Sequence, residues 1–290
     1  MSIKKSDFRC LDRMRVRWAE VDLQKIVFNA HYLMYFDTAL AALWRGFAAD
    51  YHPTMALMGG DLYVKKASLE YFASAEYDDV IDVGLRCARI CNSSITLQGG
   101  IFRGQQLLVS GELIYVFADP HSQTSKPVPP GLRRLYEGFD AGETMVQQRL
   151  GNWQELGDLS TVLRHQVFAQ EQGIAADLMC DAHDDSGVHA VFVNLVEQPI
   201  ACGRLVHETA ANGHVGRIGR MAVARPLRSS GLGGQLLQSL VDASRQRGDR
   251  AVTLHAQVSA QAFYEKHGFV PQGPVFDEAG IPHIEMQKSF

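Results

Sequence analysis

Residues 217–237 read RIGRMAVARPLRSSGLGGQLL, and this stretch decides the architecture of the second half of the chain. A strand-like segment leads through an arginine-bearing turn to Gly231, Gly233 and Gly234, and an apolar helix follows. Glycine lets the backbone approach an anion, and a helix N-terminus supplies free N–H donors and positive potential. The stretch therefore predicts a pyrophosphate-binding corner, to which Arg228 adds a charge-assisted contact. On the glycines alone, a tight turn without a ligand explains the pattern better, because the turn matches neither GxGxxG nor GxxxxGK[ST].

Strands and helices are mixed on both sides of this corner. Apolar residues at helical spacing indicate the helices, and short runs of alternating apolar and polar residues indicate the strands. The expected order is a helix at 159–172 closed by Gly173, strands at 189–197, 200–208 and 215–223, a helix with Leu232, Leu236, Leu240 and Val241 on one side, a strand at 250–257, a helix at 259–267 and a last strand near 283–287. This order predicts an α+β domain.

The corner resembles the acetyl-CoA loop of the GNAT superfamily of acetyltransferases, written [RQ]-x-x-G-x-[GA], with Arg228, Gly231 and Gly233 in place. The preceding GRMAV is similar to the splayed strand of that family. The resemblance implies that backbone amides near Met221 and Val223 hold the acetyl and pantetheine groups of acetyl-CoA.

Further strings resemble the small bacterial ElaA-like branch of GNAT proteins, and the similarity covers nearly all of residues 155–290. The strings are VFAQEQGI at 167–174, LHAQVSAQAFYEKHGF at 254–269 and EAGIPHIEM at 278–286. The resemblance implies that Tyr264 is the general acid for the departing CoA thiolate. The alternative is a tyrosine packed on the pantetheine or in the core.

Several histidines and acids in this half are open to more than one interpretation. His255, His283 and Glu171 lie in the ElaA-like strings, where they either line the acceptor pocket or make structural hydrogen bonds. A second group has no spacing typical of zinc ligands, so no metal site is expected there. Its members are His183, Asp184, Asp185 and His189.

The first half of the chain contains an acidic loop that runs into an apolar helix, EVDLQKIVFNAHYL at residues 20–33. Glu20 and Asp22 precede the helix, and Asn29 and His31 lie at its start. Free amides at a helix N-terminus stabilise negative charge on a thioester carbonyl, and a nearby carboxylate activates water or attacks directly. The alternative is that Glu20 or Asp22 caps the helix or stays in solvent.

The rest of this half predicts one antiparallel sheet curled around one long helix. Apolar residues recur at spacings of three and four in residues 29–47 and form one helix face, Tyr32, Phe36, Ala39, Leu43 and Phe47. Four strands with alternating side chains follow. On the first of them, we expect Ala67, Leu69 and Tyr71 to share one face.

The stretch at 17–39, RWAEVDLQKIVFNAHYLMYFDTA, resembles the 4-hydroxybenzoyl-CoA thioesterase-like hot-dog family, and so does the stretch at 64–98. The match covers most of residues 10–118. The resemblance implies that Asp22 is the catalytic carboxylate, that Tyr32 opens the helix and that Ser94 lies near the thioester. It also implies a homodimer or homotetramer formed through this domain, with sheets joined edge to edge.

Three residues depart from the pattern of that family. Lys25 stands where glycine is usual, Asn29 where histidine or tyrosine is common, and His31 where asparagine or serine is common. Lysine fits the loop only if the backbone there avoids a positive φ or accepts strain. Asn29 and His31 remain candidate neighbours of Asp22.

The composition is that of a folded protein of about two domains. The 290 residues are 46% hydrophobic and 21% charged, and the net charge of -4 gives no basic excess for nucleic acid or an anionic membrane. The five scattered cysteines form no CxxC pair, and the N-terminus has no apolar signal region, so we expect a cytoplasmic protein. The proline-rich stretch at 119–132 closes the first unit, which predicts a hot-dog domain at 1–148 and a GNAT domain at 149–290.

The resulting prediction is a bifunctional CoA-dependent enzyme. The first domain hydrolyses an acyl-CoA thioester, and the second transfers an acetyl group from acetyl-CoA to an unidentified amine, with both CoA esters as substrates and no tightly bound cofactor. One alternative is that either domain binds acyl-CoA without turnover, as a sensor or assembly module. Another is a hot-dog dehydratase, whose histidine-centred motif is missing from this sequence.

Overall fold

The computed structural model describes residues 3–210 and 213–290. The chain forms two compact units, which divide between Met145 and Val146. Strand β6 (Val146–Gly151) pairs with β7 of the second unit, so the expected division after residue 148 falls inside this strand. None of the helices in the described part of the chain is long and apolar enough to cross a membrane.

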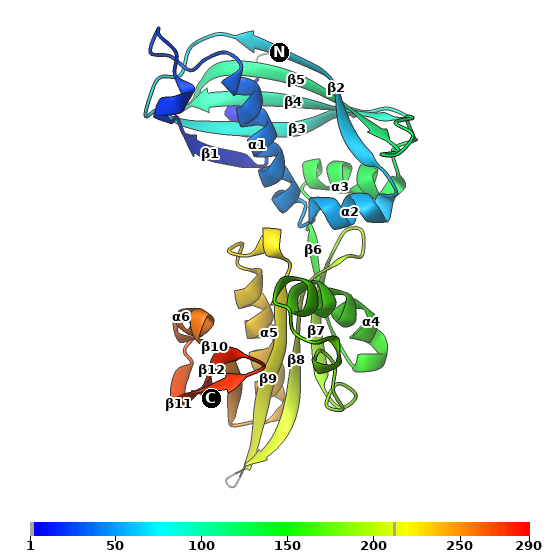
Figure 1. Ribbon diagram of the computed structural model, residues 1–290, viewed down its shortest axis with the longest axis vertical. Coiled ribbons are helices and arrows are strands. Elements are labelled where there is room, and N and C mark those ends of the chain that lie inside the picture. The colour runs from blue at the N-terminus through cyan, green and yellow to red at the C-terminus, as the bar shows by residue number, and fades with distance from the viewer. Residues whose placement is uncertain (1–2, 211–212) are drawn as a thin grey trace. The chain divides into compact units, whose positions relative to one another are not determined.

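The first unit is a five-stranded antiparallel sheet in the order β1-β3-β4-β5-β2, with helix α1 across one face (Figure 1). Two shorter helices pack beside the end of α1, where Trp44 contacts the rings of Tyr51 and Tyr136. The elements are β1 (Leu11–Arg15), α1 (His31–Gly46), α2 (Tyr51–Met58), β2 (Asp61–Tyr71), β3 (Val80–Ile90), β4 (Ser94–Arg103), β5 (Gln106–Ala118) and α3 (Pro130–Asp140).

The expected apolar face of α1 is confirmed, since all five of its residues are buried. Two glycines explain how closely the sheet approaches this helix. Gly99 and Gly111 are register partners on β4 and β5, and a Cβ at either position would lie within 3 Å of the ring of Phe36. Only glycine leaves room for this ring between helix and sheet.

Strand β2 carries the expected alternation but contributes little to the core. The alternation at residues 66–71 does form a strand, but Ala67 and Tyr71 are exposed and Leu69 is half-buried. The cause is topological, because β2 lies at the edge of the sheet and pairs only with β5. Together with the exposed Val64, this edge presents apolar surface and unpaired backbone groups.

The second unit is a seven-stranded sheet in the order β11-β12-β10-β9-β8-β7-β6, in which only β9 and β10 run parallel (Figure 1). The Sγ of Cys202 on β8 faces Ser160 of α4, whereas a Cβ at the next residue, Gly203, would meet Leu240 of α5. Neighbouring strand residues point to opposite faces, so α4 and α5 cover opposite faces of the sheet. The elements are α4 (Trp153–Arg164), β7 (Val188–Asn194), β8 (Pro199–Ala210), β9 (Gly213–Val223), α5 (Leu232–Arg247), β10 (Ala251–Gln257), α6 (Gln261–Lys266), β11 (Val270–Glu278) and β12 (Ile281–Ser289).

The helix expected at 159–172 begins earlier and changes type. Asn152 caps α4 by accepting a hydrogen bond from the backbone N–H of Glu155, so the α-helix starts at Trp153. It continues as a π-helix over His165–Glu171, a form common at functional sites. Val162 on α4 is 60% exposed, whereas Leu163 next to it is buried.

Candidate functional sites

Two adjacent strands of the second unit separate at the centre of its sheet. Pairing between β9 and β10 is confined to three residues on each strand, 216–218 and 252–254, although both strands continue further. A register shift opposite Cys202–Arg204 marks a bulge in β9, where Arg220 has a φ of 54°. Beyond Ile218, one edge of β9 is therefore left without a partner strand.

This open edge presents the amides that the sequence singled out. Ala224 donates its N–H to Ile200 O on the β8 side. Because N–H groups alternate between the two sides of a strand, those of Met221 and Val223 face the opposite, open side. The carbonyl of Val223 lies on that side too, where it accepts a hydrogen bond from Nε of Arg228.

Glycine occupies each of the three positions of the corner for a different physical reason. Gly231 is the N-cap of α5 with a φ of 90°, a conformation that other residues adopt only with strain. A Cβ at Gly234 would lie 2.8 Å from Nε2 of His267, so close packing requires glycine there. At Gly233, a Cβ would meet nothing closer than 3.6 Å and no positive φ is present, so neither the backbone nor the packing requires glycine. A close approach by a ligand is the remaining physical reason.

Arg228 is engaged within the protein. Its two Nη atoms donate to the carboxylate oxygens of Glu171 at 2.6 and 2.7 Å. This bidentate pair joins the corner to the end of the π-helix, and it lowers the pKa of Glu171 below its ordinary value. The sequence left open whether Glu171 lines the acceptor pocket or makes structural hydrogen bonds. In the structure it is the hydrogen-bond partner of Arg228.

The gap between the strands opens into a cavity of about 570 Å³. Tyr264, Met221, His255 and His283 all line it. The hydroxyl of Tyr264 contacts Met221 Sδ at 3.9 Å, and burial raises the pKa of this phenol to about 12. The tyrosine thus keeps its proton at neutral pH, as a general acid must.

The charged residues that line this cavity were not singled out from the sequence. Arg204, Arg217 and Arg220 point into it from the central strands β8 and β9. Their one local signal was the presence of charges within otherwise apolar strands. Within the described residues, no group of three or more metal-ligating side chains occurs. Asp184, one of the residues considered for a metal, instead accepts hydrogen bonds from Arg164 and Arg204.

In the first unit, the acidic loop holds the backbone of Lys25 in a strained conformation. Lys25 has a φ of 65°, so the lysine takes up the conformation for which glycine is better suited. The N–H of Lys25 donates to Asp22 O, and that of Gln24 donates to Asp22 Oδ1 at 2.8 Å. Asp22 is half-buried, and its second carboxylate oxygen has no hydrogen-bond partner within the described ranges.

The second acid of this loop, Glu20, is fully engaged in the fold. It is 3% exposed and accepts hydrogen bonds from Tyr35, from the backbone N–H of Arg17 and from the Arg17 side chain. Burial works to raise the pKa of Glu20, but these donors outweigh it and lower the pKa. His31 contacts the carbonyl of Glu20 through Nδ1 at 3.0 Å. Glu20 therefore ties the loop to α1, whereas Asp22 keeps one carboxylate oxygen free among the described residues.

The other expected neighbours of Asp22 lie in different places. Asn29 is exposed beside the start of α1, whereas Tyr32 is 2% exposed and its hydroxyl accepts the N–H of Ala75. Ser94 begins β4, and the loop of Asp22 lies near the opposite end of the sheet, where Ile26 pairs with Glu76. The ten residues of β4 span about 30 Å. One copy of the chain therefore does not bring Asp22 and Ser94 together.

The comparisons with known proteins agree with both folds. The family profile of the thioesterase-like superfamily matches residues 16–135, and that of the acetyltransferase (GNAT) domain matches residues 185–290. The uncharacterized N-acetyltransferase YjcF of Bacillus subtilis (strain 168) is 34% identical over 138 residues, which cover 47% of this chain and 94% of YjcF. The protein ElaA of Escherichia coli (strain K12) is 40% identical over 72 residues, which cover 24% of this chain and 47% of ElaA.

Among solved structures, the probable thioesterase YbaW from Escherichia coli is 20% identical, covers 45% of this chain and 98% of its own, and gives a TM-score of 0.41. The matched residues and the two folds define a thioesterase-like hot-dog domain followed by a GNAT domain. The chain belongs to the GNAT acetyltransferases through its second unit, and residues 16–135 of its first unit match the thioesterase-like superfamily.

Proposed function

We propose that the second domain transfers the acetyl group of acetyl-CoA to an amine. The observation that carries this proposal is the open edge of β9, which runs from the glycine corner into the cavity beside Tyr264. Free N–H groups in the first turn of α5 bind the pyrophosphate of acetyl-CoA. The amides of Met221 and Val223 bind the acetyl and pantetheine groups along the open edge.

In this reaction, the amine nitrogen attacks the thioester carbon directly. The new C–N bond forms, the C–S bond breaks, and the amine gives up one proton to the solvent or to a base. Tyr264 donates its proton to the sulfur, so that CoA leaves as a thiol. The amides on β9 stabilise the negative charge that develops on the carbonyl oxygen.

The first domain, in our proposal, hydrolyses an acyl-CoA thioester. Asp22 acts as general base or nucleophile, and amides at the start of α1 polarise the carbonyl. The assignment to Asp22 is supported by its free carboxylate oxygen and by the full engagement of Glu20.

We also propose that this domain works as a homodimer or larger homo-oligomer. The exposed edge of β2, with its unpaired backbone groups, suits edge-to-edge pairing with a second copy. Antiparallel pairing of two β2 edges would set the Ser94 end of one sheet beside the Asp22 end of the other. The two halves of the site, which lie apart in one copy, would then meet between copies.

The test is an assay of thiol release from a panel of acyl-CoAs, with and without a panel of amines. Release without amine reports hydrolysis, and the additional release with amine, together with acetylated product, reports transfer. A protein that binds both esters yet releases no thiol in either arm is a binding module, and the proposal of two enzymes is then wrong.

A further inference from the structure

The wall of the cavity in the second domain carries two groups of charged side chains, and their net charges are opposite. The first, the arginine group, consists of Arg164, Arg204, Arg220, Asp181 and Asp184. The second, the acidic group, consists of Arg217, Glu208 and Glu278, together with His255. Every member lines the cavity except Arg164 and Asp184, which lie directly behind the arginine group.

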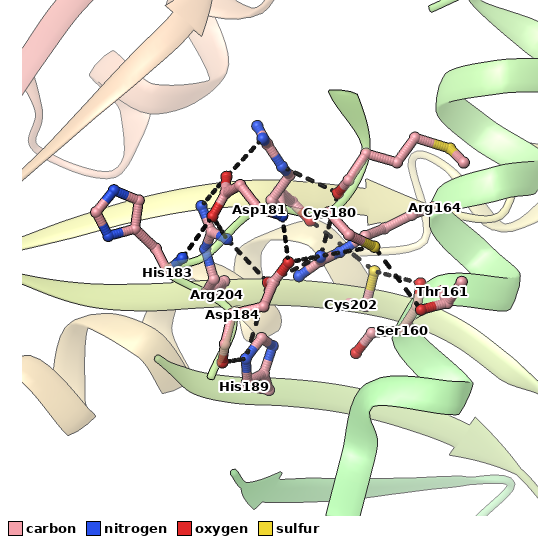
Figure 2. Close-up of polar contacts among 12 residues, drawn as sticks. Ser160, Thr161, Arg164, Cys180, Asp181, His183, Asp184, His189, Cys202 and Arg204 are labelled. Carbon is pink, nitrogen blue, oxygen red and sulfur yellow. Dashed lines mark hydrogen bonds and ion pairs between the residues drawn. The ribbon is translucent and has the colours of Figure 1, made fainter. Parts of the chain in front are cut away.

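The arginine group is tightly connected, as Figure 2 shows around Asp181 and Asp184. Arg204 donates to Asp181 at 2.6 and 3.0 Å and to Asp184 at 2.8 Å. Arg220 donates to Asp181 at 2.8 Å. Arg164, which is fully buried, donates to Asp184 at 2.9 Å and stacks its guanidinium on the ring of Trp153.

This group holds one more positive charge than negative, because three guanidinium groups face two carboxylates. The excess acts on its neighbours. Burial lowers the pKa of Arg220, and the adjacent charge of Arg204 lowers it further. Burial also lowers the pKa of His189, and the charge of Arg164 adds to this effect. One donor is unused, since Nη1 of Arg220 has no hydrogen-bond partner in the parts of the chain that the structure describes.

The acidic group has the opposite balance, with two carboxylates and one guanidinium. Arg217 donates to Glu208 at 3.0 Å and to the ring of His255. His255 Nδ1 lies 2.7 Å from Glu278 Oε2, while Oε1 of Glu278 has no partner among the described side chains. The group therefore offers a free carboxylate oxygen beside an imidazole, which is an environment suited to an ammonium group.

The two groups lie at different ends of the cavity wall. Arg204 and Glu208 are both on β8, four residues apart on the same face, which corresponds to about 13 Å of strand. The side chains extend from there into the cavity, so a small molecule can contact both groups at once.

We infer that the amine acceptor is a zwitterion of the amino-acid class, a primary amine that also carries a carboxylate. Its carboxylate is bound by Arg220 in the arginine group, and its amine is received by Glu278 and His255 in the acidic group. This inference rests on the proposed acetyl transfer and names the acceptor for it. An alkylamine without a carboxylate would leave the excess positive charge of the arginine group uncompensated.

The test compares ω-amino acids with alkylamines of the same chain length, such as 6-aminohexanoate with hexylamine and 4-aminobutyrate with butylamine. Each pair differs only in the carboxylate. The full-length protein is supplied with acetyl-CoA, and the acetylated product is quantified by mass spectrometry, because hydrolysis by the first domain also releases thiol. We expect kcat/KM for the amino acid of at least one pair to exceed that of its alkylamine by about 10- to 150-fold.

The variant Arg220→Gln should reduce this preference to nearly one, because only the amino acid has a carboxylate for Arg220 to bind. Because Arg220 also holds Asp181, a second measurement uses the unmodified protein: hexanoate should compete with 6-aminohexanoate, and hexanol should not. Equal or faster acetylation of the alkylamines overturns the inference but leaves acetyl transfer standing. Acetylation of no amine in either arm overturns the proposed transfer, and the inference with it.

Discussion

The two units differ in how completely one copy of the chain assembles its site. In the second unit, residues from the π-helix at 165–171 to β12 meet around one cavity, which the open edge of β9 reaches at Met221. In the first unit, Asp22 lies near one end of the sheet and Ser94 at the other. In both units a loop motif indicates a candidate site, but among the described residues of one copy the candidate side chains meet around a cavity in the second unit and lie apart in the first.

The largest expected effect separates the two active sites. Asp22→Asn keeps the size of the side chain and removes its charge, so hydrolysis of acyl-CoA should fall by about 10²- to 10⁴-fold while acetyl transfer is unchanged. Thiol release without amine measures the first quantity, and acetylated product measures the second. Glu20→Gln is the matched control, because Glu20 is engaged with Arg17 and Tyr35 and should affect stability more than turnover. Near-full hydrolysis by Asp22→Asn, with loss in Glu20→Gln, would move the assignment to the other acid.

The need for a second copy is tested at the edge of β2. Val64 is 54% exposed on this edge, and a lysine there disfavours pairing between edges. Val64→Lys should shift the protein from oligomer to monomer in light scattering and lower hydrolysis about 100-fold, since Asp22 then lacks its partner surface. Val162→Lys, at a valine 60% exposed on α4, is the control and should change neither. A monomeric Val64→Lys protein that hydrolyses at the normal rate would show that one copy suffices.

Tyr264→Phe tests the intramolecular site with little risk to the fold. The tyrosine hydroxyl has one hydrogen-bond contact within the described residues, Met221 Sδ at 3.9 Å, so its removal should cost little stability. We expect kcat of acetyl transfer to fall about 100-fold and hydrolysis to remain normal. Steady-state kinetics with an excess of amine give kcat. If kcat is unchanged, the thiolate takes its proton from elsewhere and Tyr264 serves as packing.

Features that depend on neighbouring residues were predicted from the sequence, whereas features that depend on residues far apart in the chain were not. The apolar face of α1 and the glycine corner are local, and both the periodicity and the motif indicated them. Pairing between distant residues was not readable: Arg228 and Glu171 are 57 positions apart, and His255 and Glu278 belong to different strands. The exposure of β2 also depends on the strand order, which alternation alone does not specify.

The pair of Arg228 and Glu171 allows a further test of the corner. If Arg228 also contacts the pyrophosphate, Arg228→Ala should weaken CoA binding by about 10- to 150-fold, and Glu171→Gln should leave it unchanged or stronger because a negative charge is removed. Residues 146–290 have their own core, so we expect this fragment to fold alone and to permit calorimetric titration without the first domain. Equal losses in both variants would mean that Arg228 acts as a clamp on the π-helix rather than as an anion ligand.

The smallest expected effect concerns the stability of the arginine group in acid. Hydrogen bonds from Arg204 lower the pKa of Asp181 from its ordinary value of 3.8 to about 2. A carboxylate with a depressed pKa in the folded state stabilises the fold above the unfolded value, and this contribution is lost as the pH falls through the folded value. Asp181 should therefore contribute at most about 2 kcal/mol at neutral pH, and this contribution should disappear between about pH 4 and pH 2.

Urea unfolding of residues 146–290 measures this contribution, because Trp153 is the single tryptophan of that fragment and stacks on Arg164. Asp181→Asn should lower the free energy of unfolding at pH 7 and converge with the parent near pH 2. Asp185→Asn, at an exposed neighbouring position, should follow the parent at every pH. If Asp181→Asn differs from the parent by the same amount at pH 7 and at pH 2, the loss comes from packing, and the carboxylate charge does not hold Arg204 and Arg220 together.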